Sequence, residues 1–198
     1  MHKSLSVLLL LCLSTFALAE DIELGRLQAN EYNEFLKNQV EKDIMIRYDT
    51  ETKEAYLVTK DIFGFAVMRI NEAQMPFVDE ALAKYQDWNA KAIAKKVKLD
   101  KEICELSFPY SWQFGDSWNN ADSDPLVSFH FFSQQPTRHQ LCFVFPRLTS
   151  SSNQFITKTP ETLYFDAETD FHGPPEIMQE WVPRASRAKT GIEKIATA

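Results

Sequence analysis

The chain has 198 residues, of which 44% are hydrophobic, 25% charged and 13% aromatic. This composition excludes a disordered, collagen-like or low-complexity chain and is typical of a folded domain with a hydrophobic core. The formal net charge of −7 argues against nucleic-acid binding, because phosphates are bound mainly by Lys and Arg.

The first 19 residues have the pattern of a secretory signal peptide. Lys3 precedes a short apolar run, and Ala17 and Ala19 form an A-x-A cleavage site. The apolar run is shorter than the roughly 20 residues that a transmembrane helix needs. Without Lys3, the mature chain of residues 20–198 has 20 Lys and Arg against 28 Asp and Glu, a net charge of −8. We expect a soluble exported protein, periplasmic or extracellular, with no transmembrane segment.

The first half of the mature chain contains two helical patterns separated by strand patterns. Residues 20–43 place apolar side chains at mostly three- and four-residue intervals, which predicts an amphipathic helix. Two β-rich runs around a polar turn predict a hairpin over 44–59, and a third strand is expected at 63–70. Residues 71–96 give the clearest helical period, with Pro76 in the first turn.

The second half reads mainly as strands. The expected elements are a strand at 97–106, an aromatic polar loop to Pro125, strands at 126–133 and 140–149, a short strand near 162–165, and a helical tail over 175–181 that frays beyond about 184. Strands in runs indicate an α+β class rather than alternating βα units. We therefore predict one domain with an antiparallel sheet of about six to seven strands, and with the long helix and terminal helices packed on one face.

Two cysteines, Cys104 and Cys142, remain after removal of the signal peptide. An isolated pair in an oxidising compartment typically forms a disulfide, which is the expectation here. Two buried free thiols are the alternative. Neither cysteine has a second cysteine or a histidine at the spacing of zinc ligands.

The most distinctive segment is aromatic and spans residues 108–118. Four of its aromatic residues occupy alternate positions, which places them on one face of an extended segment. That face is either core or an exposed platform for a sugar ring or a protein partner, because Tyr and Trp often anchor interfaces. The candidate binding residues are Tyr110, Trp112, Phe114, Asp116, Trp118 and Asn119.

A second candidate site is acidic. Asp166, Glu168, Asp170 and His172 occupy alternate positions and resemble the start of an oxygen-ligand calcium loop. The segment lacks the glycine and the glutamate that an EF-hand needs at its sixth and twelfth positions, so a solvated acidic loop is the alternative. We expect no cofactor, and calcium at this loop is the alternative that the sequence leaves open.

Motifs for catalysis are absent: there is no G-x-S-x-G elbow, and Cys142 and His139 fall on opposite faces of an expected strand. We therefore expect an exported, non-catalytic binding protein of the cell envelope that recognises a protein or an envelope component through its aromatic and acidic surface. One alternative is a secreted hydrolase or metal-dependent enzyme that uses the acidic loops 116–124 and 166–172. The other is a structural or assembly factor of the envelope.

Overall fold

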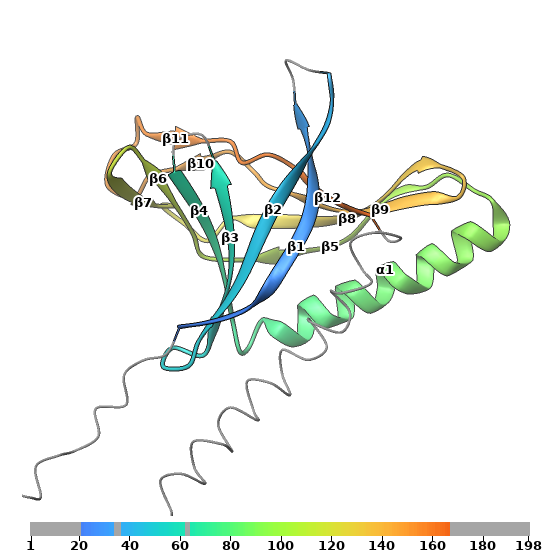
Figure 1. The fold of residues 1–198 in the computed structure, drawn as a ribbon, viewed down its shortest axis with the longest axis horizontal. Helices are drawn as coiled ribbons and strands as arrows, with labels where there is room; N and C mark the ends of the chain where they lie inside the picture. Colours follow the sequence, from blue (N-terminus) through green and yellow to red (C-terminus); the bar gives the residue numbers. More distant parts are fainter. Residues whose placement is uncertain (1–20, 34–36, 62–63, 167–198) are drawn as a thin grey trace, which may run out of the picture.

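A computed structural model describes residues 21–33, 37–61 and 64–166. Within these ranges the chain forms one ten-stranded antiparallel sheet, a two-stranded sheet and one helix (Figure 1). The elements in chain order are β1 (Asp21–Asn33), β2 (Asn38–Asp49), β3 (Glu54–Asp61), β4 (Gly64–Asn71), α1 (Met75–Lys95), β5 (Asp100–Ser107), β6 (Tyr110–Phe114), β7 (Ser117–Asn120), β8 (Leu126–Gln135), β9 (Arg138–Val144), β10 (Leu148–Thr149), β11 (Thr157–Lys158) and β12 (Leu163–Asp166).

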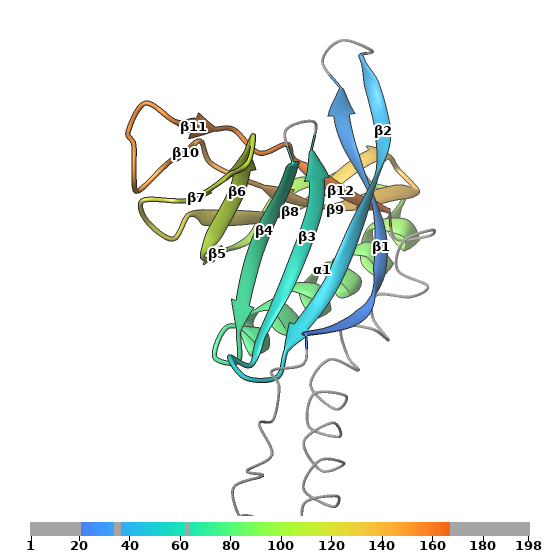
Figure 2. The ribbon, with the colours of Figure 1, turned by 60° about the vertical axis from the view of Figure 1, so that its left-hand side comes forward.

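The large sheet has the order β5-β8-β9-β12-β1-β2-β3-β4-β6-β7 and is strongly bent. Figures 1 and 2 show the half that contains β1 to β4 crossing in front of the half that contains β8, β9 and β12. The predicted α+β class is therefore wrong: the described chain is mostly β, with more strands and fewer helices than expected.

The main error falls on residues 20–43, where a helix was expected. This region contains β1 and the start of β2, which pair along their whole length with a bulge between Glu23 and Gly25. Leu27 and Ala29 are buried at alternate positions of β1, and Ile44 and Ile46 repeat that period on β2. Burial at every second residue is typical of a strand with one buried face. The three- and four-residue spacing of other apolar side chains therefore wrongly predicted a helix.

The long helix is confirmed within narrower limits than 71–96. It begins after Gln74 and ends at Lys96, whose positive φ of 52° breaks the helical path. Its buried side chains follow the helical period and face β5, β8 and β9; they are Met75, Val78, Ala81, Leu82, Tyr85 and Ala92. Within the described residues, no helix is both long and apolar enough to cross a membrane.

Most of the remaining strand predictions are confirmed with shifted bounds. The hairpin of β2 and β3, the strand β4 and the antiparallel pair of β8 and β9 all form where the sequence patterns indicated. The expected loop before Pro125 contains β6 and β7 instead. The expected signal peptide, the tail helix and the fraying end lie outside the described residues.

The core lies between the two facing halves of the sheet. One half contributes residues of β2, β3, β4 and β6, and the other contributes aromatic side chains of β8, β9 and β12. Phe143 is central to the second group, with its ring centroid 4.3 Å from Phe129 and 4.9 Å from Phe165. Helix α1 extends this layer, because Tyr85 and Trp88 both contact the Phe131 ring.

The expected disulfide is not formed, and both Cys104 and Cys142 are free thiols. Cys104 on β5 stands opposite Phe129 of β8, whereas Cys142 on β9 stands opposite His130. Strand β8 therefore separates the two cysteines, which puts their Cα atoms about 9–10 Å apart, beyond disulfide reach. Because consecutive residues of β8 point to opposite faces, the two thiols also lie on opposite faces of the sheet.

Candidate functional site

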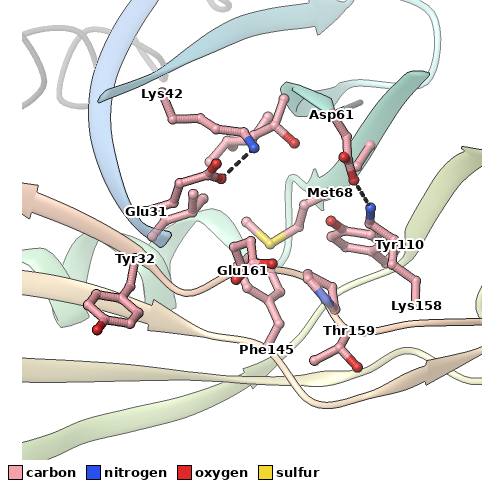
Figure 3. Close-up of a pocket in the computed structure, with 15 residues that line it drawn as sticks. Glu31, Tyr32, Lys42, Asp61, Met68, Tyr110, Phe145, Lys158, Thr159 and Glu161 are labelled. Carbon is pink, nitrogen blue, oxygen red and sulfur yellow. Dashed lines mark hydrogen bonds and ion pairs between the residues drawn. The ribbon is translucent and has the colours of Figure 1, made fainter. Parts of the chain in front are cut away.

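A pocket of about 330 Å³ opens between the two halves of the sheet (Figure 3). One side is formed by the inner face of β1 to β4 and by β6, and the other by Phe145 and residues 158–163. Its apolar and aromatic lining includes Leu57, Ala66, Met68, Tyr110, Phe145 and Leu163. The register of the sheet explains this grouping, because Leu57 is paired with Met68, and Met68 with Tyr110, on one face.

Two ion pairs line the pocket on opposite sides (Figure 3). Lys42 of β2 contacts Glu31 of β1 at 2.5 Å, and Lys158 contacts Asp61 at the end of β3. Their side chains are only 16–29% exposed. Glu31 and Lys42 continue the inward-facing positions of Ala29 and Ile44, so the strand period itself carries these charges into the pocket.

A third carboxylate, Glu161, lies between the two ion pairs in Figure 3. Partial burial raises the pKa of Glu161, and the negative charges of Glu31 and Asp61 raise it further against the opposing effect of the two lysines. Among the described residues, no side chain donates a hydrogen bond to this carboxylate or forms an ion pair with it. The pocket therefore contains an acid that is influenced by both lysines but is paired directly with neither of them.

Tyr110 supplies a hydroxyl group to the same pocket. Burial and the charge of Asp61 raise the pKa of Tyr110, so the phenol remains protonated at all physiological pH values. Its ring meets Phe145 edge-on with centroids 5.7 Å apart. The hydroxyl has no hydrogen-bond partner among the described residues, which leaves it available to a ligand.

The predicted aromatic site is divided by the structure. Tyr110 and Trp112 are core residues at 6% and 2% exposure, whereas Phe114 and Trp118 are 57% and 52% exposed. Asp116 is exposed in the turn between β6 and β7. The alternate aromatics Tyr110, Trp112 and Phe114 share one face of β6, and that face is buried only as far as Trp112.

Trp118 lies on the other face of the β6–β7 hairpin. It is paired with Gln113, whose side-chain oxygen also accepts a hydrogen bond from the backbone N–H of Phe65 at 3.0 Å. Gly64 suits this junction, because its φ is 137° and a Cβ atom there would lie 2.6 Å from the Cβ atom of Gln113. Phe65 is itself 42% exposed, so Phe65 and Trp118 flank Gln113 on the outer face.

Asn119, the last predicted binding residue, is buried and has a structural role. Its side-chain oxygen accepts a hydrogen bond from the Ser150 hydroxyl at 3.0 Å, which joins β7 to the segment after β10. Its Nδ2 atom is buried without a partner.

Of the predicted calcium ligands, only Asp166 lies within the described residues. It is 3% exposed and forms an ion pair with Arg138 at 2.7 Å. Glu168, Asp170 and His172 lie outside those residues. In the part of the chain that the structure describes, no three His, Cys, Asp or Glu side chains are arranged to hold a metal ion.

A buried serine–histidine contact lies beneath helix α1. The Ser133 hydroxyl is 2.8 Å from Nδ1 of His139 and accepts a hydrogen bond from the backbone N–H of Leu99 at 2.9 Å. Burial lowers the pKa of His139, and its Nε2 atom is buried without a partner. A serine and a base at this distance resemble a nucleophilic pair. Because His139 is 2% exposed and lines no described pocket, the contact is structural.

Sequence reasoning identified only one residue of the pocket lining, Tyr110. One sequence feature could have revealed the pocket: charged residues such as Glu31, Lys42 and Asp61 occupy strand positions whose side chains point inward. The mistaken helix at 20–43 concealed the first two. In comparisons with protein-family models, curated proteins and solved structures, the chain matched none.

Proposed function

We propose that this chain is an exported, non-catalytic binding protein that holds a small amphipathic molecule in the pocket between the two halves of its sheet. The observation that carries the proposal is the pocket itself, whose lining combines apolar and aromatic side chains with two ion pairs and Glu161. Ligand sites are typically concave, mostly apolar and equipped with a few polar groups, and a volume of about 330 Å³ lies at the lower end of their range.

Binding fits this site better than catalysis. General acid–base chemistry needs a proton donor or acceptor with a suitable pKa, held within reach of the reacting atom. Here Lys42 and Lys158 are each engaged by a carboxylate, and the Tyr110 phenol is held in its protonated form. Glu161 is then the one acid of the pocket without an ion pair among the described residues, and no second such group stands beside it to complete an acid–base pair. These groups can orient a ligand at the mouth of the pocket while its apolar part is buried.

The proposal is tested with 4-phenyl-1-butanol, a neutral probe with an apolar body and one polar end. At about 0.3 kcal/mol per heavy atom, its dissociation constant should be on the order of millimolar. We expect its titration to shift backbone amide NMR signals of pocket residues such as Leu57, Met68 and Tyr110. Thr59→Trp, which places a large ring in the pocket, should abolish these shifts.

Val58→Trp is the matched control. It adds the same ring to the neighbouring residue of β3, whose side chain points to the other face. This variant should bind the probe as the unmodified protein does, and both variants should retain the circular dichroism spectrum of the fold. Equal binding by the unmodified protein and by Thr59→Trp would contradict the proposal, because the probe would then bind elsewhere.

A second candidate function is contact with a protein or envelope component through the β6–β7 hairpin. It is favoured by the exposure of Phe114 and Trp118 beside Asp116, which leaves part of the predicted aromatic and acidic surface accessible. Exposed aromatic side chains are typical anchors of interfaces.

A further inference from the structure

The charges around the pocket indicate what kind of polar end its ligand carries. Three carboxylates and two ammonium groups line the site, a net charge of −1 when all are ionised. The two ammonium groups are engaged by Glu31 and Asp61, so an anionic ligand would have to compete with an existing ion pair. It would also be repelled by Glu161.

Glu161 is the charged group of the pocket with which a ligand can form an ion pair. Its carboxylate faces the space between the two ion pairs. Burial, together with the negative charges of Glu31 and Asp61, raises the pKa of this carboxylate against the opposing effect of the two lysines. A positive group placed beside it would reverse that effect, because an opposite charge within about 4–6 Å stabilises a carboxylate. A bare metal ion fits less well, since no three metal-ligating side chains converge anywhere in the described residues.

The apolar part of the ligand has a defined place as well. Met68, Tyr110 and Phe145 form an apolar and aromatic wall next to Glu161 (Figure 3). The Tyr110 hydroxyl can accept a hydrogen bond from an N–H group near Asp61. A molecule with a cationic nitrogen and an apolar body could therefore pack against this wall, donate a hydrogen bond to the Tyr110 hydroxyl and form an ion pair with the Glu161 carboxylate.

We propose that the pocket binds a small organic ammonium compound, with its positive nitrogen at Glu161 and its apolar body against Met68, Tyr110 and Phe145. This inference rests on the proposed function and names the ligand class of the same pocket.

The test compares three probes that share one body and differ in charge: 4-phenylbutylamine, 4-phenyl-1-butanol and 4-phenylbutanoate. Their dissociation constants are measured at pH 7 by NMR shift titration. The amine should bind about fivefold more tightly than the alcohol, the range of a partly exposed charged contact. The carboxylate should bind most weakly. Added salt should reduce the advantage of the amine, because salt screens exposed charges.

Glu161→Gln removes the charge and keeps the shape of the side chain. In this variant the amine and the alcohol should bind with similar affinity, while the affinity for the alcohol stays unchanged. The matched control, Glu51→Gln, removes a charge of the same kind from the exposed turn between β2 and β3 and should preserve the preference for the amine.

The outcomes separate the two proposals. If the alcohol binds in the pocket and the amine has no advantage, or if Glu161→Gln keeps the advantage, the ammonium inference is overturned and the pocket function stands. The same holds if the carboxylate binds most tightly. If none of the probes binds, both proposals fail.

Discussion

His139 has an unusual environment for a titratable side chain. It lies under helix α1, with its ring 5.1 Å from that of Phe131, and its backbone carbonyl accepts a hydrogen bond from the Tyr85 hydroxyl at 3.0 Å. One ring nitrogen contacts Ser133 and the other has no partner. Protonation would place a charge in this site without a counter-ion, which explains why burial lowers the pKa of His139.

The lowered pKa predicts a loss of stability in acid. The unfolded chain binds a proton at a histidine pKa of about 6.5, whereas folded His139 binds it only at lower pH. The contribution of His139 is therefore fully present above about pH 6.5 and is lost as the pH falls from there towards the folded pKa. His139→Asn, which retains a polar contact for Ser133, should weaken the dependence of the unfolding free energy on pH in this window. Denaturant unfolding at several pH values measures the effect.

His130 provides the control for this measurement. It is half-buried on the other face of β8, between Asp100 and Glu102 at 3.8 and 3.9 Å. It therefore lies outside the buried site of His139. The His130→Asn variant should keep the acid-sensitive slope of the unmodified protein. An unchanged slope in His139→Asn would contradict the assignment to His139.

At the scale of elements, the β6–β7 hairpin shows what alternation in a sequence can and cannot establish. The alternate aromatic residues of β6, Tyr110, Trp112 and Phe114, lie on one face of the strand. The boundary between core and surface falls between Trp112 and Phe114, and it depends on how far the opposite half of the sheet extends. No pattern within the hairpin contains that information.

The division within the hairpin predicts two distinct tryptophan environments. Acrylamide should quench the fluorescence of Trp118 strongly and that of Trp112 weakly. Trp118→Phe should therefore lower the overall quenching constant, and its unfolding free energy should stay within about 0.5 kcal/mol of the original value, as for surface substitutions. Trp112→Phe should leave the strongly quenched component intact and destabilise the protein by about 1–3 kcal/mol, because it shrinks a buried side chain. The reverse pattern of quenching would place Trp112, not Trp118, at the surface.

At the scale of the whole molecule, the pocket depends on contacts between distant parts of the chain. Glu31 and Lys42 meet across one hairpin, but Asp61 and Lys158 are brought together only by the bend of the large sheet. Strands β3, β4 and β8 could be predicted from their own sequences, because the buried residues of each strand alternate with more exposed ones. The strand order β12-β1-β2 pairs the end of the described chain with its beginning, and no sequence pattern within these strands predicts that pairing. Glu161 could not be identified as a pocket residue without knowing this strand order.

The same topology determines the state of the cysteines, and it overrides the argument from cellular compartment. Because β8 separates Cys104 from Cys142, an oxidising environment alone cannot join them in the folded protein. A protein of residues 20–198, denatured without reductant, should therefore react with two equivalents of a thiol reagent. The native protein should react slowly, because burial raises the pKa of both thiols and reduces the reactive thiolate. Full reaction after reduction serves as the control. Zero equivalents before reduction would mean that the cysteines are bonded, which would require a different pairing of β5, β8 and β9.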